Sequence, residues 1–153
     1  MQMNSLQPAT TLRAALLCVL LAFLTACATS PTGRRQLMLV SEDQAIAASK
    51  QQYLATMSEL SKEGKLVTDP KLLKRVDTIT GKLIAQAIEM RPATKNWEWS
   101  VEVIDDPEMV NAWCMAGGRM ALYTGLINKV DPTDDELAQV MGHEISHALA
   151  HHT

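Results

Sequence analysis

The sequence predicts an α+β domain that is mainly helical and contains a small antiparallel sheet. Capping signals at Ser41, Asp69 and Thr133 each precede a segment whose apolar residues recur at helical spacing. Between the second and the third of these helices, residues 97–103 alternate between apolar and polar side chains, which indicates a half-buried strand. Two short apolar runs that flank the glycine pair at 117–118 predict a β-hairpin.

Residues 1–26 are predicted to be an export signal. Arg13 supplies a weakly charged start, residues 14–24 form an apolar run, and Thr25-Ala26-Cys27 has the small side chains of a processing site. The tetrapeptide that ends at Cys27 resembles the lipobox of bacterial lipoproteins, which predicts lipidation of this cysteine. The alternatives are a cleaved signal without lipid and a membrane anchor, although about 13 apolar residues are too few to cross roughly 30 Å of hydrocarbon.

Residues 27–40 are predicted to be the lipidated N-terminus and a short tether, because residues 28–35 are small, polar and rich in turn formers. Ala28 would follow the lipidated cysteine. The sorting rule of enteric lipoproteins reserves aspartate at this position for the inner membrane, so alanine predicts an outer-membrane protein that faces the periplasm. Two interpretations of Arg34 and Arg35 remain: their side chains are solvated, or they contact anionic lipid head groups.

Residues 41–153 have the composition of one small domain. Removal of residues 1–26 takes away one of the 14 Lys and Arg residues and none of the 17 Asp and Glu, so the formal charge becomes −4 and no nucleic-acid partner is expected. Cys18 leaves with the signal and Cys27 carries lipid. Cys114 is then the only free thiol, which excludes an internal disulfide, and we expect stability to come from packing and a bound metal.

Two scaffold helices are predicted in the first half of this domain. Ser41 starts the first helix, with a capping-box partner three residues later, and the helix is expected to end near Glu63, before a glycine. Asp69 starts the second helix, with proline at the first helical position, and apolar residues at helical spacing continue to Ile88.

The second half of the domain is predicted to hold the sheet and the last helix. The strand over residues 97–103 is followed by a hairpin of residues 111–115 and 119–124. A short helical piece at 126–130 leads into a helix from about 133 to 151, which opens with a capping box and a negatively charged first turn. The residues expected on the buried face of the first strand are Trp97, Trp99, Val101 and Val103.

The last predicted helix carries the pentad His143-Glu144-Ile145-Ser146-His147. A random order of the same residues gives roughly 0.006 such HExxH pentads, so chance does not explain it. On a helix, His143 and His147 lie about 40° apart in azimuth and roughly 6 Å apart along the axis, so both imidazoles can bind one zinc ion. Glu144 points about 100° away from His143 and can take a proton from a zinc-bound water. The alternative is an amphipathic helix with exposed histidines.

Two more histidines follow the pentad, at His151 and His152. His151 lies eight residues after His143 and therefore near the same face of the helix, which makes it a candidate ligand. The alternative is an exposed histidine in a last turn, where the helix dipole favours it.

Several motifs, in this order, resemble those of the HtpX-like and CAAX-prenyl-protease-like zinc metallopeptidases, specifically their periplasmic lipoprotein branch. The motifs are the lipobox, Thr32-Gly33-Arg34-Arg35-Gln36-Leu37, Asn111-Ala112-Trp113-Cys114-Met115-Ala116-Gly117-Gly118, Tyr123-Thr124-Gly125-Leu126 and the HExxH pentad. The resemblance implies a zincin-like fold of the gluzincin type, with a small sheet beside the active-site helix. It also implies one zinc ion as cofactor and endopeptidase activity in quality control of the cell envelope.

The resemblance implies roles for individual residues. The implied zinc ligands are His143 and His147, and the implied catalytic acid/base is Glu144. The segment Asn111-Ala112-Trp113 resembles the edge strand on which such enzymes bind substrate. Backbone hydrogen bonds to such a strand recognise an extended peptide largely independently of its side chains. An ordinary hairpin strand buried by Trp113 is the alternative, and Cys114 is either a latent zinc ligand or a small buried thiol.

Members of this family take a third zinc ligand from a glutamate on a downstream helix, whereas this sequence ends at Thr153, six residues after His147. We therefore expect an incomplete metallopeptidase domain, in which apolar surface such as Ile145 or Leu149 is exposed where the missing helix packs. Two functions remain. The first is a membrane-anchored zinc endopeptidase that cuts misfolded or misassembled envelope proteins. The second is a proteolytically inactive, lipid-anchored binding or chaperone-like module.

Overall fold

The protein is described by a computed structural model. The residues that it describes are 27–29, 35–37 and 40–150. The predicted export signal, His151 and His152 lie outside these residues. The chain divides into two units, residues 1–39 and residues 40–153, and each unit is described by itself.

In the first unit, two short strands pair with each other. Strand β1 (Cys27–Thr29) runs antiparallel to β2 (Arg35–Leu37), with Ala28 opposite Gln36. Both strands lie in the predicted tether, which therefore contains a short ladder in addition to turn-rich sequence.

The second unit contains every helix and strand segment predicted after residue 40. Its elements are α2 (Glu42–Lys62), α3 (Pro70–Met90), the 3-10 helix η1 (Pro92–Asn96), β3 (Ser100–Ile104), β4 (Ala112–Met115), β5 (Arg119–Tyr123), α4 (Thr124–Val130) and α5 (Asp134–Leu149). Within the described part of the chain, no helix has the length and apolar character that crossing a membrane requires.

The two scaffold helices begin where the capping signals predicted. The Ser41 hydroxyl accepts a hydrogen bond from the Gln44 backbone N–H at 3.2 Å, and the Gln44 side chain accepts one from the Ser41 N–H. After α2, Gly64 has a φ of +68°, the left-handed conformation that ends many helices. The Asp69 carboxylate accepts a hydrogen bond from the Lys71 N–H and so caps α3.

The second unit's sheet is mixed, so the prediction of an antiparallel sheet was wrong for one of its two strand pairs. The strand order is β3-β5-β4, with β4 antiparallel and β3 parallel to β5. The hairpin of β4 and β5 forms as predicted. Residues 105–111 connect β3 to β4. These two strands lie two strand spacings apart, at roughly 4.8 Å each, which leaves the position between them for β5. The second strand of the hairpin therefore fits between β3 and β4.

Strand β3 begins later than predicted, because Trp97 and Trp99 precede the ladder. Pro92 starts η1, and the Trp99 indole N–H donates a hydrogen bond to the Thr94 carbonyl at 2.9 Å. The rings of Trp97 and Trp99 pack at 5.3 Å between centroids. Both tryptophans do contact the main core, as do Val101 and Val103, so the predicted buried face is confirmed although the strand is shorter.

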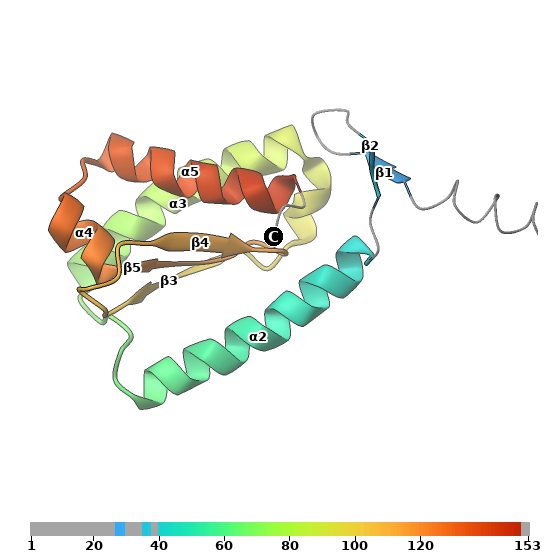
Figure 1. Ribbon diagram of the computed structural model, residues 1–153. Coiled ribbons are helices and arrows are strands. Elements are labelled where there is room, and N and C mark those ends of the chain that lie inside the picture. The colour runs from blue at the N-terminus through green and yellow to red at the C-terminus, as the bar shows by residue number, and fades with distance from the viewer. Residues whose placement is uncertain (1–26, 30–34, 38–39, 151–153) are drawn as a thin grey trace, which may run out of the picture. The chain divides into compact units, whose positions relative to one another are not determined.

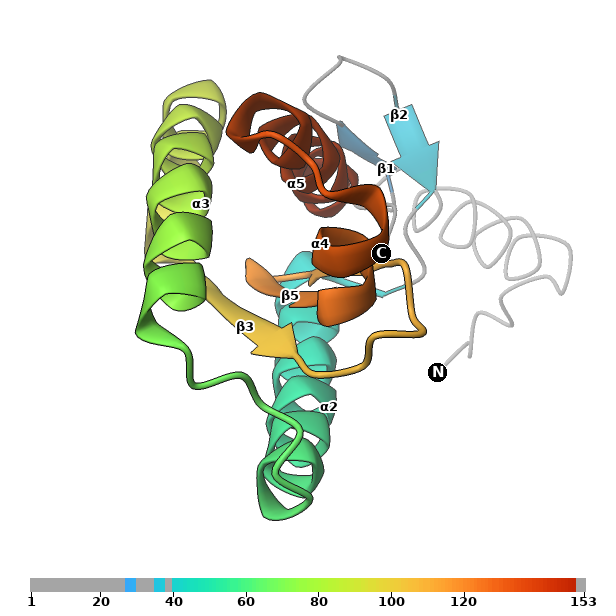
Figure 2. The same cartoon turned by 90° about the vertical axis from the view of Figure 1, so that its left-hand side faces the viewer.

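Helices cover both faces of this sheet. Helices α3 and α5 pack on one face and α2 lies along the other, as the two views show (Figures 1 and 2). The larger core cluster lies between the sheet, α3 and α5, with Leu122, Leu137 and Met141 fully buried. The smaller cluster joins Tyr53 and Met57 of α2 to the opposite face of the sheet. Alternate residues of each strand therefore point into different core clusters, on opposite faces of the sheet.

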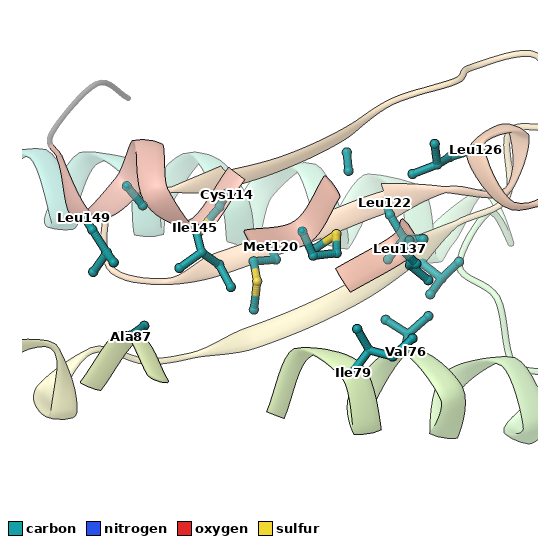
Figure 3. Close-up of a cluster of buried hydrophobic side chains, with 14 residues drawn as sticks. Val76, Ile79, Ala87, Cys114, Met120, Leu122, Leu126, Leu137, Ile145 and Leu149 are labelled. Carbon is teal, nitrogen blue, oxygen red and sulfur yellow. The ribbon is translucent and has the colours of Figure 1, made fainter. Parts of the chain in front are cut away.

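The predicted exposure of Ile145 and Leu149 was wrong. Their side chains are 3% and 6% exposed, and both belong to the cluster between α5, the sheet and α3 (Figure 3). The reason is helical geometry, because Ile145 lies about 200° around the helix from His143. The apolar residues of the pentad's helix face the core of this domain. The face that a further element could cover is the one that carries the histidines.

Candidate metal centre

Helix α5 turns the polar residues of the pentad away from the core. The helix starts with the predicted capping box, in which the Thr133 N–H donates to the Glu136 carboxylate at 2.8 Å and the Glu136 N–H donates to the Thr133 hydroxyl at 3.3 Å. His143 is exposed, and Glu144 and His147 are partly buried. The buried side of the helix holds Leu137, Met141, Ile145, Ala148 and Leu149.

The two histidines of the pentad converge, as their spacing predicted. Their Nε2 atoms are 3.0 Å apart, with ring centroids 4.5 Å apart and ring planes at 87°. A zinc ion binds imidazole nitrogens at about 2.0–2.1 Å, so two nitrogens in a tetrahedral site are roughly 3.3 Å apart. The observed separation is close to that value. The side chains of His143 and His147 therefore fit a shared zinc ion with little movement.

The described residues provide two ligands for such an ion. Among them, no group of three or more His, Cys, Asp or Glu side chains is placed to hold one metal. A catalytic zinc site normally has three protein ligands and a water. The pair His143 and His147 is therefore a partial site, and the candidate ligand His151 lies outside the described residues.

Cys114 is a buried core thiol, as one of its two interpretations predicted. Its side chain is 5% exposed and packs in the cluster beneath α5, and its Sγ atom lies 3.7 Å from the Met115 carbonyl oxygen. Burial, with a smaller contribution from the negative charge of Glu144, raises the pKa of Cys114 to about 12. The thiol therefore stays protonated at neutral pH.

The predicted substrate strand is the edge of the second unit's sheet. Strand β4 pairs with β5 alone in that sheet and packs beneath α5 (Figure 1). The Tyr123 N–H donates to the Asn111 carbonyl at 3.1 Å, and hydrogen-bonded residues alternate along an antiparallel pair. The backbone groups of Ala112 and Cys114 therefore point away from β5, toward the edge where an extended peptide can pair.

One of these edge groups has a partner of its own. The Asn111 side-chain carbonyl accepts a hydrogen bond from the Ala112 N–H at 2.9 Å. This contact covers the first outward-pointing donor of the edge, which a peptide carbonyl must displace in order to bind there. It also places the Asn111 amide group beside any such peptide.

Trp113 is partly buried and packs on the opposite face of the sheet from α5. Its ring meets the ring of Tyr53 edge to face, with 5.9 Å between centroids and 81° between planes. Both interpretations of this strand, a substrate-binding edge and an ordinary hairpin strand buried by Trp113, stay predictions. Tyr53 was not predicted from the sequence as a partner of Trp113, although its position in the apolar pattern of α2 is the signal that could have identified it.

Arg91 is a second residue whose role was not predicted from the sequence. Its guanidinium donates to the carbonyl of Leu149 in the last turn of α5 at 3.3 Å and to the Glu42 carboxylate at 2.7 Å, and it lies over the Trp97 ring at 5.7 Å. It therefore joins the C-terminal end of the histidine-bearing helix to the start of α2. The signal for such a role is an arginine at a helix end, where side chains commonly hydrogen-bond free carbonyls.

Known proteins with similar sequences include metallopeptidases. The model of peptidase family M48 matches residues 70–153, which contain the whole pentad. The human metalloendopeptidase OMA1, mitochondrial, is 30% identical over 125 residues, which cover 79% of this chain and 22% of the human protein. The mitochondrial metalloendopeptidase OMA1 of Arabidopsis thaliana is 44% identical over 54 residues, 35% of this chain and 11% of that protein.

A bacterial relative is the β-barrel assembly-enhancing protease of Yersinia pestis, which is 30% identical over 87 residues, 57% of this chain and 16% of that protein. The chain thus spans about a fifth or less of the length of these curated relatives. Because the family model covers more than half of the chain, including the helix with both histidines, the chain belongs to peptidase family M48.

Proposed function

We propose that this protein is a zinc-dependent metalloendopeptidase in which His143 and His147 bind the metal and Glu144 is the catalytic acid/base. The observation that carries the proposal is the convergence of the two Nε2 atoms on the exposed face of α5, beside the edge of β4 that has no ladder partner among the described residues. Membership of peptidase family M48 and the metalloendopeptidase relatives support it. A third ligand from a part of the natural protein beyond the described residues would complete the site.

The residues of the chain have separate tasks in this proposal. A zinc ion at the histidine pair would supply Lewis acidity for the scissile carbonyl and lower the pKa of a bound water. The Glu144 carboxylate takes a proton from the attacking water and passes it to the leaving amine. The edge of β4 holds the substrate extended through backbone hydrogen bonds at Ala112 and Cys114, and the Asn111 amide lies next to it.

The proposed substrates are misfolded or misassembled proteins of the bacterial envelope. The lipobox-like sequence at Cys27 supports a lipid anchor, which would hold the enzyme at the periplasmic side of a membrane, with the outer membrane indicated by Ala28. These features, together with the order of motifs, also support the HtpX-like lipoprotein branch. Metabolic labelling with a fatty acid tests the anchor, since label must enter the wild-type protein and be absent from a Cys27→Ala variant.

Metal analysis and cleavage of an unfolded protein such as casein test the enzymatic proposal. The expected result is one zinc ion per chain in the wild-type protein and in Glu144→Gln, with cleavage slower by about 10²-fold to 10⁴-fold in the variant. His147→Ala is expected to lose both zinc and cleavage. Glu89→Gln on exposed α3 surface is a matched control that changes neither.

The outcomes separate the two functions. Cleavage that is unchanged in Glu144→Gln would refute the proposed mechanism. Zinc binding without any cleavage by the natural full-length protein would instead favour the second candidate, a lipid-anchored module that binds unfolded chains at the β4 edge without cutting them.

A further inference from the structure

The two faces of β4 offer an added peptide strand different neighbours. Residues of a strand point alternately to opposite faces of the sheet. On the α5 face, β4 presents Ala112 and Cys114, which are small and buried at 7% and 5% exposure. On the α2 face it presents Trp113 and Met115, which are large, apolar and only partly buried. A large apolar contact for a substrate side chain therefore exists on the α2 face alone.

Trp113 has a fixed orientation before any peptide binds. Its indole packs edge to face on Tyr53, which is 5% exposed, and the Tyr53 hydroxyl donates to the Met120 carbonyl of β5 at 3.4 Å. Tyr53 is thus attached to the central strand and Trp113 rests on it. Because the ring is already ordered, little rotamer entropy is lost when a substrate side chain covers its exposed part.

On the opposite face, the substrate meets polar groups. Side chains of a peptide paired with β4 that point to the α5 face approach the helix that carries His143, Glu144 and His147, which are exposed or partly buried. Polar or small side chains suit these positions. The two faces together favour a peptide in which apolar and polar residues alternate.

We propose that Trp113 is a specificity-determining residue that selects extended peptides with apolar side chains at alternate positions, on the α2 face of β4. This inference rests on the proposed function and defines the substrate class of the proposed peptidase. The substrates are chain segments that alternate apolar and polar residues, as a half-buried β-strand does, and that are not paired in a sheet. Such segments are exposed when a β-rich protein misfolds. Backbone pairing gives the affinity and Trp113 gives the choice of segment.

Peptide binding to the Glu144→Gln protein tests this inference without cleavage. Two labelled ten-residue peptides of the same composition are compared by fluorescence anisotropy. One alternates Leu and Ser. The other is Ser-Leu-Leu-Ser-Ser-Leu-Leu-Ser-Ser-Leu, in which two consecutive positions of one strand face are never both Leu. The alternating peptide can form one more apolar cross-strand pair on the α2 face, so it is expected to bind about threefold more tightly. Introducing Trp113→Ser is expected to reduce this preference to less than twofold.

Matched variants separate specificity from loss of folding. Trp113→Phe, which keeps an aromatic ring on Tyr53, is expected to restore most of the preference. Leu54→Ser, at an exposed apolar position of α2, is expected to leave it unchanged. Equal binding of the two peptides by the Glu144→Gln protein, or a preference that survives in Trp113→Ser, would overturn the inference. This comparison of peptides remains decisive even if Trp113→Ser does not fold.

Cleavage assays distinguish failure of the inference from failure of the proposed function. If the zinc-loaded wild-type protein cuts both peptides equally well through Glu144, the peptidase function stands and the role of Trp113 is refuted. If the protein binds the alternating peptide preferentially but cuts neither, the specificity of the edge stands and the peptidase function fails.

Discussion

Truncation of Ile145 within the HExxH pentad is expected to destabilise the protein while leaving the proposed metal ligands in place. The side chain is 3% exposed and belongs to the cluster between α5, the sheet and α3, which also contains Met120 (Figure 3). Ile145→Ala removes three buried carbons at about 0.8 kcal/mol each and leaves a cavity, and such substitutions lower the free energy of unfolding by about 2–5 kcal/mol. We expect a loss of about 3 kcal/mol.

Urea unfolding followed by circular dichroism measures this loss. With a slope of roughly 1.5–2 kcal/mol/M for a domain of this size, the midpoint is expected to fall by about 1.5–2 M with an unchanged slope. Ser146→Ala, the next residue of the pentad, is the matched control. Ser146 is exposed and its hydroxyl donates only to the His143 carbonyl, so its loss is expected to change stability by less than about 0.5 kcal/mol.

An Ile145→Ala loss below about 1 kcal/mol, or an equal loss in Ser146→Ala, would refute this reasoning. Either result would mean that α5 is rotated about its axis relative to the core. The histidines would then no longer occupy the exposed face. The stability measurement therefore also tests the orientation of the candidate metal centre.

Three further predictions concern the scaffold. Gly118→Ala is expected to destabilise the protein by more than about 1 kcal/mol, because φ is +83° and a Cβ would lie 2.5 Å from the Trp99 ring. The control is Gly81→Ala within α3, where a Cβ would meet no atom within 4 Å, and thermal melts are expected to show a gain of about 0.5–1 kcal/mol. Arg91→Met is expected to lower the free energy of unfolding by about 1–3 kcal/mol, because it removes the contacts to α5 and α2. The control is Lys62→Met, which removes an exposed ion pair and is expected to change the free energy of unfolding by less than about 0.5 kcal/mol in urea titrations. The raised pKa of Cys114, about 12 against 9.0 for an ordinary thiol, predicts stability that is fully present below pH 9 and declines by at most about 1.4 kcal/mol per pH unit between pH 9 and pH 12, because only the unfolded chain loses the proton there. Unfolding curves of Cys114→Ala, which lacks this contribution, measure it by difference.

Helix starts and the pentad geometry could be predicted because both depend on neighbouring residues. The capping boxes at Ser41 and Thr133 and the aspartate cap at Asp69 use partners within three residues, and all three were confirmed. The approach of His143 and His147 follows from the helical repeat alone. Local sequence therefore carries the information for these features.

Features that depend on distant segments could not be predicted in the same way. Alternation identifies a strand, but it does not say which strand lies in the middle of a sheet, so the parallel pairing of β3 with β5 was missed. The burial of Ile145 was misjudged because the packing of α5 on α3 is not visible in the pentad itself. The contact of Arg91 with Glu42 joins residues 49 positions apart, and that of Trp113 with Tyr53 joins residues 60 positions apart. Local patterns can identify Arg91 and Tyr53, but they do not identify the distant partner of either residue.

The central place of β5 has a consequence for the order in which the chain folds. Strands β3 and β4 are not bonded to each other, so apart from the bridge between Leu66 and Ile104, β3 has no ladder neighbour among the described residues until residues 119–123 join the sheet. A middle strand that comes last in the sequence raises the contact order and slows folding. Until it pairs, the chain presents an apolar strand to other polypeptides, and a chaperone that shields it at this stage is expected to increase the yield of folded protein.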